Sequence, residues 1–204
     1  ADRVAVNPPG VDLDLWTPVV DDPPRATDDR LRVVFVGGDF DRKGGNDLLA
    51  WFRSNTDPRY ELHLVTPEDV DPEPGVTVHR LSEADPEMQE FVRRAHVFVL
   101  PSRAECFGLA TLEALASGVP VVQSTVGGAA DIVTPGVTGA LVRAGSTDEI
   151  GRALAEVFED PDRYDQMRLA ARADAVERFS IARNVDATVA LIHEAIAAHA
   201  AEER

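Results

Sequence analysis

Short apolar segments rich in β-branched residues alternate along this chain with longer segments of helical spacing, and no other feature constrains the fold as strongly. Strands are predicted at residues 32–36, 60–65, 76–79, 97–100, 119–122 and 140–142. Helices are predicted at residues 46–55, 86–94, 107–117, about 147–158, 161–179 and 181–200. Because strands alternating with helices form βαβ units, the sequence predicts an α/β fold. It should contain a doubly wound parallel sheet, with extra C-terminal helices from about residue 147.

The first 30 residues differ in texture from the rest of the chain. Asn-Pro-Pro-Gly at 7–10 and Asp-Asp-Pro-Pro at 21–24 favour turns and extended backbone over helix or strand. We therefore interpret residues 1–30 as a linker or arm that lies on another surface. Residues 31–204 are interpreted as one α/β domain.

Charge and cysteine content exclude several classes of protein. Lys and Arg total 20 against 36 Asp and Glu, a net charge of −16 that disfavours nucleic acid and anionic membrane as partners. A single cysteine excludes a disulfide framework and a multi-cysteine zinc site. There is no apolar run of about 20 residues and no signal-peptide layout at the N-terminus. The sequence thus predicts no integral membrane segment and a cytoplasmic location.

A glycine-rich segment with two cations follows the first predicted strand. Gly37 and Gly38 open it, and Arg42 and Lys43 precede a second glycine pair and a predicted helix. Glycines let a ligand approach the backbone, and a helix N-terminus offers free N–H groups to an anion. The alternative is an ordinary glycine-rich turn with solvated charges. Lys43 is the only lysine among the 20 basic residues, which favours a specific role.

Two glutamates eight positions apart follow the fourth predicted strand. Glu105 precedes the helix expected at 107–117, and Glu113 lies inside it among apolar residues. A buried carboxylate is costly unless it is paired or bound, so Glu113 is either part of an ion pair or an acceptor for the two hydroxyls of a ribose. The backbone around Phe107 and Gly108 begins the helix and could form a second anion site facing the first.

At these residues the sequence resembles a known family. The block 101–122 (PSRAECFGLATLEALASGVPVV), with its E-x7-E spacing, is similar to the signature of the retaining GT-B glycosyltransferases of group 1 (family 4), which use nucleotide-sugar donors. Further likenesses occur in the family's order at 7–12 (NPPGVD), 35–45 (FVGGDFDRKGG), 127–128 (GG), 138–142 (TGALV) and 179–180 (FS). The resemblance implies a Rossmann-like C-terminal half of a GT-B fold.

The resemblance also implies roles for individual residues. Binding of the donor diphosphate falls to a set of backbone amides and cations: Gly37, Gly38, Arg42, Lys43, Leu109 and Ala110. Glu105, with the amides around Phe107 and Gly108, would hold the transferred sugar and is the catalytic candidate. Glu113 would take the ribose hydroxyls. No metal and no cofactor are expected, since cations and helix dipoles would neutralise the leaving group.

The family's resemblance implies a partner domain as well. The enzymes have two Rossmann-like domains, and this chain starts at the linker, so we expect the N-terminal, acceptor-binding domain to be absent and the isolated piece to be inactive. The helix 181–200 would cross back onto that domain in the family, and here it could mediate self-association. Two alternatives to transfer remain, a GT-B sugar-nucleotide epimerase and a non-catalytic nucleotide-binding module. Cysteine catalysis through Cys106 is disfavoured because no histidine neighbours it in the sequence.

Overall fold

Six parallel strands form one sheet in the computed structural model, which describes residues 4–21, 23–71, 73–81 and 85–202. The order is β3-β2-β1-β4-β5-β6, the order of a Rossmann-type doubly wound sheet. The strand bounds are β1 Leu31–Val36, β2 Tyr60–Val65, β3 Val76–His79, β4 Val97–Leu100, β5 Val121–Ser124 and β6 Gly139–Val142. The predicted fold class is therefore confirmed.

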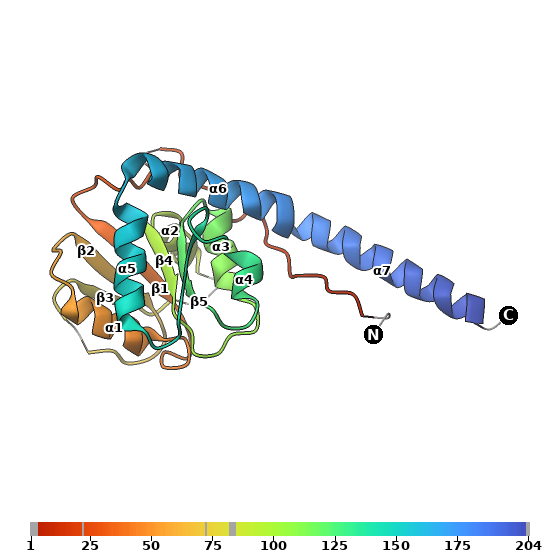
Figure 1. Cartoon of the computed structure of the whole chain (residues 1–204), viewed down its shortest axis with the longest axis horizontal. Coiled ribbons are helices and arrows are strands. Elements are labelled where there is room, and N and C mark those ends of the chain that lie inside the picture. The colour runs from red at the N-terminus through yellow and green to blue at the C-terminus, as the bar shows by residue number, and fades with distance from the viewer. Residues whose placement is uncertain (1–3, 22, 72, 82–84, 203–204) are drawn as a thin grey trace.

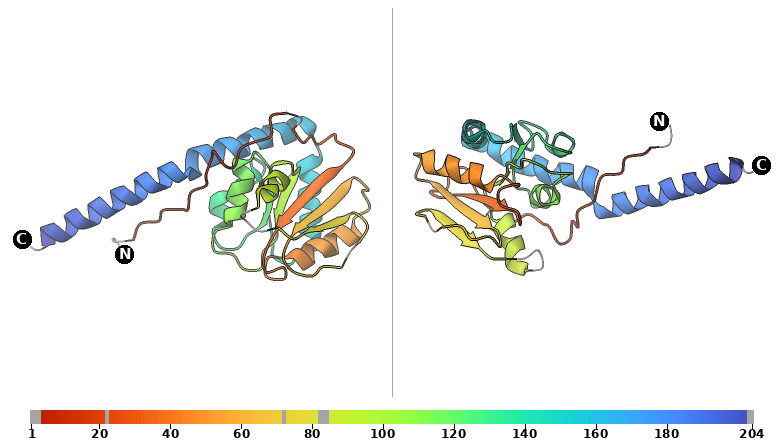
Figure 2. Two further views of the ribbon diagram at one scale, coloured as in Figure 1. Left: turned by 180° about the vertical axis from the view of Figure 1, so that it is seen from behind. Right: turned by 90° about the horizontal axis from the view of Figure 1, so that it is seen from below.

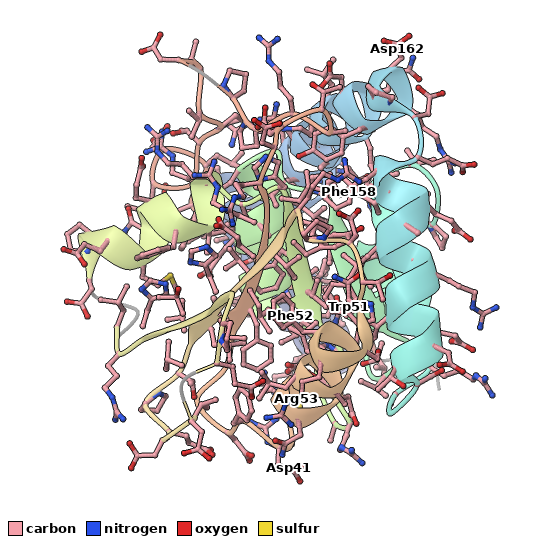
Figure 3. The ribbon with its side chains drawn as sticks, turned by 90° about the vertical axis from the view of Figure 1, so that its left-hand side faces the viewer. Asp41, Trp51, Phe52, Arg53, Phe158 and Asp162 are labelled. Carbon is pink, nitrogen blue, oxygen red and sulfur yellow. The ribbon has the colours of Figure 1, made fainter. Side chains whose placement is uncertain are left out.

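Helices cover both faces of this sheet. Their bounds are α1 Gly45–Ser54, α2 Pro86–Arg93, α3 Leu109–Ala116, α4 Ala129–Ile132, α5 Thr147–Phe158, α6 Pro161–Phe179 and α7 Ile181–Glu202. Helix α1 packs against α5, while α3 packs against α2 and α6. The sheet lies between α5 and α2 in Figure 1, and Figure 3 shows the same layers edge-on. This layering explains why β4 is fully buried and wholly apolar.

Three of the differences between the structure and the sequence prediction concern β5, α3 and α4. Strand β5 begins two residues later than expected, because Val119 and Pro120 form the connection from α3 and bond to Ala114 and Phe98 through their backbone. Helix α3 begins at Leu109 rather than at residue 107, because the preceding glycine has a left-handed backbone. The four-residue helix α4 was not predicted at all, since it is shorter than two turns and carries no readable period.

An aromatic cluster joins α1 and α5 to the sheet. The ring centroids of Trp51 and Tyr60 are 5.2 Å apart, and those of Tyr60 and Phe158 are 6.0 Å apart. Figure 3 labels Trp51 on α1 and Phe158 at the end of α5, and Tyr60 is the first residue of β2. All three side chains are buried, so aromatic packing helps to hold α1 and α5 on this face of the sheet.

The N-terminal arm lies along the last two helices. Val11 pairs with Ser180, donating to the Phe179 carbonyl (2.7 Å) and accepting from the Ile181 N–H (3.0 Å). From there α7 projects away from the body with the arm beside its first turns (Figures 1 and 2). Residues 1–3 and 22 of the predicted arm lie outside the described residues. Its apolar residues Val11, Trp16 and Ala26 belong to the core.

Helix α7 carries an apolar stripe that the rest of the described chain leaves uncovered. The stripe residues are 45–62% exposed: Ile181, Val185, Val189, Ile192 and Ile196. Ser180 caps this helix as the sequence suggested, accepting from the Arg183 N–H (3.2 Å). Over the described residues, no helix combines the length and apolarity that a membrane crossing requires.

Candidate functional site

Two loops meet at the carboxyl edge of the sheet. The segment 37–44 follows β1, and the segment 101–108 follows β4. Because β1 pairs with β4 in parallel, both loops leave the sheet at the same edge. The Arg103 N–H donates to the Arg42 carbonyl (2.8 Å), and a Cβ added to Gly44 would lie only 2.1 Å from the Pro101 carbonyl oxygen. Glycine at 44, with φ +80°, is thus required for the loops to touch.

An ion pair joins the loops through side chains. Lys43 Nζ donates to Glu105 Oε2, and the side chains are only 20% and 12% exposed. The other oxygen of Glu105 accepts from the Cys106 N–H (3.0 Å). The structure therefore brings together the two predicted residues that carry opposite charge, 62 positions apart in the sequence.

Arg42 supplies a second cation at the same place. Its Nε donates to Asp39 (2.9 Å) and its Nη1 to the Ala104 carbonyl (3.1 Å), so it too spans the loops. These bonds to Arg42, together with the charge of its guanidinium, lower the pKa of the Asp39 carboxyl. The Arg42 side chain remains 46% exposed, so a ligand above the loops could reach it.

The start of α3 points into this region. Gly108 precedes the helix with φ +104°, and its carbonyl accepts from Thr111 (3.0 Å). Leu109 and Ala110 are the first two helical residues, so their N–H groups have no carbonyl one turn earlier within the helix. Glu113 is half-buried one turn further on, and because Cβ atoms tilt toward a helix N-terminus, its side chain leans toward the same end.

The two glycines that follow β1 are not equivalent. Gly37 is buried, and its N–H already donates to the Val65 carbonyl of β2 (3.0 Å). That amide is used by the sheet, which removes the reason for expecting it to bind a ligand. Gly38 is exposed, and a Cβ there would meet nothing within 4 Å. Of the pair, Gly38 alone keeps the open backbone that anion binding requires.

The third loop at this edge follows β5. Gly127 has φ +57°, and a Cβ there would lie 2.0 Å from the Glu105 carbonyl oxygen. The Gly128 N–H donates to the Cys106 carbonyl (2.9 Å), and its backbone packs on the Phe107 ring. The Phe107 ring in turn meets Phe179 edge-on at 6.2 Å. The loop that carries Glu105 thus packs closely against the glycines of the loop after β5.

Three histidines with lowered pKa lie outside these loops. Burial lowers the pKa of His63, whose Nδ1 lies 3.1 Å from His79 Nε2, and burial also lowers the pKa of His79. Burial lowers the pKa of His96 despite its bond to Asp28 (2.8 Å). Because His96 Nδ1 accepts from the Arg32 N–H, the proton of the neutral ring is on Nε2. Across the described part of the chain, no three His, Cys, Asp or Glu residues form a group that could hold a metal ion.

The family model "Glycosyl transferases group 1" matches residues 20–174, which include both loops and the Lys43–Glu105 pair. The chain belongs to this family. The relatives include D-inositol 3-phosphate glycosyltransferase of Paenarthrobacter aurescens, 31% identical over 96% of this chain and 52% of that protein. Alpha-maltose-1-phosphate synthase of Mycolicibacterium smegmatis is 30% identical over 92% of this chain and 56% of its own length. The chain therefore spans about half the length of these curated relatives.

Solved structures of other proteins share the fold. Sucrose-phosphate synthase of Thermosynechococcus elongatus matches with a TM-score of 0.81 and 28% identity, over 95% of this chain and 53% of that one. Anabaena Alr3699/HepE, solved in complex with UDP-glucose, matches with a TM-score of 0.76 and 20% identity over 91% of this chain and 56% of its own. The Rossmann-like half of a GT-B fold, implied by the sequence, is thus confirmed.

Several residues at the site were missed by sequence reasoning. Arg103 pairs with Asp47 of α1 (2.8 Å) and so ties the loop after β4 to the helix after β1. Gln123 and Thr111 are fully buried polar residues directly below Gly108. The only sequence signal was Gln123 itself, an amide that follows the apolar run at the start of its strand.

Proposed function

We propose that this chain is the donor-binding part of a retaining, metal-independent glycosyltransferase that moves a sugar from a nucleotide-diphospho-sugar to an acceptor hydroxyl. The observation that carries the proposal is the contact of Lys43 with Glu105 across the two loops. It places a cation suited to a diphosphate beside a carboxylate suited to sugar hydroxyls. Membership of the glycosyl transferase family supports the same chemistry.

The diphosphate would lie between the first loop and the start of α3. An ammonium group has three N–H donors, so Lys43 can keep Glu105 and still bind a phosphate oxygen. Arg42, the Gly38 amide and the N–H groups of Leu109 and Ala110 would add further donors. This supply of positive charge is the basis for proposing that the leaving group needs no metal ion.

The two glutamates would then bind the two sugars of the donor. Glu105 is fixed by Lys43 and by the Cys106 N–H, and its remaining lone pairs would accept from hydroxyls of the transferred sugar. Glu113, one turn into α3, would accept from the ribose hydroxyls. The Phe107 and Gly108 backbone completes the wall beside the transferred sugar. Each carboxylate would then serve a separate ring of the donor.

The proposed reaction breaks the bond between the anomeric carbon and the diphosphate oxygen. The acceptor oxygen attacks the same carbon from the face that the diphosphate leaves, so the configuration is retained. The acceptor proton passes to the departing diphosphate, whose charge is held by Lys43, Arg42 and the α3 N-terminus. Glu105 is the catalytic candidate because it touches the sugar that develops positive charge.

Because the chain spans about half of its relatives, we propose that a second domain supplies the acceptor site. Residues 1–30 would form the connection to it, and the reaction would take place in the cytoplasm. The exposed stripe of α7 would contact that domain or a second copy of this chain. In isolation the chain would bind donor without transferring its sugar.

A titration of thermal unfolding tests the donor site. UDP, GDP and ADP would each be added with and without Mg²⁺ to the wild-type chain and to Lys43→Ala and Glu113→Ala. One nucleotide should stabilise the chain without metal. Lys43→Ala should weaken its affinity about 10- to 100-fold, since a charge-assisted hydrogen bond contributes about 1.5–3 kcal/mol. Arg30→Ala is the matched control, because Arg30 pairs with Glu61 at the opposite edge of the sheet.

Three outcomes would contradict the proposal. Absence of stabilisation by all three nucleotides would remove the donor site, and equal affinity in Glu113→Ala would remove the ribose role of Glu113. Strict dependence of nucleotide binding on Mg²⁺ would overturn metal independence.

Retention is tested with the chain joined to its acceptor domain, by recording the anomeric configuration of the product with NMR. A changed free sugar nucleotide without acceptor would indicate an epimerase instead.

A further inference from the structure

A fully buried amide lies at the carboxyl end of β5. Gln123 is 0% exposed and sits between Leu100 of β4 and Leu141 of β6 in the sheet register. Neither Nε2 nor Oε1 has a hydrogen-bond partner among the protein atoms of the described residues. Burying an amide with both of its polar atoms unpaired is unfavourable, and native proteins rarely tolerate it without a reason.

A second unpaired polar atom lies on the same side of Gly108. A Cβ added to Gly108 would be 3.1 Å from Gln123 Nε2 and 3.2 Å from Thr111 Oγ1. Thr111 is also 0% exposed, and its hydroxyl has no partner in the described part of the chain. The side-chain amide of Gln123 and the hydroxyl of Thr111 therefore lie close together beside Gly108, the residue that precedes α3. We call Gln123 and Thr111 the Gly108 support.

We propose that the Gly108 support binds one buried water molecule and that Gln123 is a positioning residue for the start of α3. Buried water typically makes about three hydrogen bonds to groups of this kind. The amide supplies one donor and one acceptor, and the hydroxyl supplies the third partner. The inference rests on the proposed function in one respect: the amides that it would position, at Leu109 and Ala110, are those assigned to the donor diphosphate.

The left-handed backbone of Gly108 makes such a support effective. With φ +104°, Gly108 sets the direction in which the next two N–H groups leave the helix. A bridging water there would resist rotation of this residue, which is buried although Cys106 and Leu109 beside it are exposed. Loss of the bridge should therefore loosen the helix start more than the rest of the fold.

Ser117 offers a matched control at the other end of the same helix. It is 0% exposed, and its hydroxyl likewise has no partner within the described residues. It follows Ala116, the last residue of α3, and so lies about two turns from Gly108. A general effect of removing a buried polar atom from α3 should appear at Ser117, whereas an effect on the Gly108 support should not.

The test combines isosteric variants with two measurements. Gln123→Met and Thr111→Val remove hydrogen bonds at nearly constant volume, Thr111→Ser keeps the hydroxyl, and Ser117→Ala is the control. Dissociation constants for UDP, GDP and ADP would be measured by calorimetry. Hydrogen-exchange rates would be measured by NMR without ligand for the Thr111 and Leu112 amides, which donate to the Gly108 carbonyl (3.0 and 3.3 Å). We expect Gln123→Met and Thr111→Val each to weaken binding about tenfold and to speed exchange about tenfold. Their combination should do no more, because both remove the same water.

The measurements separate this inference from the proposed function. Should wild-type protein bind none of the nucleotides, the donor site fails, while the exchange rates still decide the role of Gln123. Wild-type affinity and exchange in Gln123→Met and Thr111→Val would overturn the inference, as would additive effects of the two. Changes of equal size in Ser117→Ala would overturn it as well. If Gln123→Met does not fold, Thr111→Val set against Thr111→Ser provides the same comparison.

Discussion

The pair Lys43–Glu105 should contribute measurably to stability, in contrast to the exposed ion pairs of this acidic chain. Its side chains are 20% and 12% exposed, whereas those of Arg80–Asp69 are 60% and 94% exposed. Removing one partner of a buried pair costs about 3–5 kcal/mol, and exposed pairs contribute about 0–1 kcal/mol. For this intermediate burial we expect Lys43→Met to lower the free energy of unfolding by about 2 kcal/mol. In a chain of 204 residues that corresponds to about 4–8 °C in Tm.

The double variant separates a lost contact from an uncompensated charge. Most of the loss in Lys43→Met should come from leaving Glu105 ionised and unpaired in a shielded site. Adding Glu105→Gln removes that charge and should restore about 1 kcal/mol. Urea unfolding followed by circular dichroism at pH 7 would be measured for the wild type, Lys43→Met, Glu105→Gln and the double variant. Arg80→Met is the control, and its free energy of unfolding should change by less than about 0.5 kcal/mol. Additive losses, or a loss in Lys43→Met no larger than in Arg80→Met, would refute the reasoning.

Three further changes should affect stability. Gly127→Ala should lower the free energy of unfolding in urea by about 3 kcal/mol, because Gly127 has φ +57° and the added Cβ would lie 2.0 Å from the Glu105 carbonyl oxygen. A wild-type midpoint would contradict this. Tyr164→Phe should lose about 1–2 kcal/mol, since its hydroxyl donates to the His96 carbonyl (2.9 Å), and a calorimetric Tm equal to wild type would argue against the bond. Acidification from pH 7.5 to 5.5 should destabilise the chain. Burial lowers the pKa of His63, His79 and His96 below the ordinary 6.5. On acidification the unfolded state therefore binds protons at a higher pH than the folded state, and stability decreases as the pH decreases. A flat profile of stability against pH would exclude this linkage.

The sequence predicted the elements whose patterns are local. Strand β4 is an uninterrupted apolar run stopped by Pro101, and its bounds match the structure residue for residue. Strand β5 was placed two residues early, because its last two residues, Gln123 and Ser124, are polar although both are fully buried. The hydropathy pattern predicts that the strand ends at Val122. In the structure, pairing with β4 and β6 extends β5 beyond that residue. Tertiary pairing overrides local pattern at this point.

The site could be predicted by residue type but not by contact. The sequence indicated Lys43 and Glu105 separately, yet their ion pair depends on β1 and β4 being neighbours, which the strand order decides. The sequence analysis assigned the Gly37 backbone amide to a ligand, because a sequence does not show which N–H groups form hydrogen bonds within the sheet. Gln123 and Thr111 were missed for a similar reason, since an unpaired polar atom is a property of the packed structure alone.

The clasp between Val11 and Ser180 has a mechanical consequence. The arm and α7 leave the body at one point and run side by side, with Asn7 donating to the Asn184 carbonyl (3.0 Å) and the Thr188 hydroxyl (2.7 Å). Tension applied to residue 4 and residue 202 would first peel these two segments apart. The load would then reach two backbone bonds at Val11 before it reached any strand. The six-stranded sheet is thereby shielded from a force applied to either end. The clasp acts as a single pivot for the movement of the arm and α7 relative to the body.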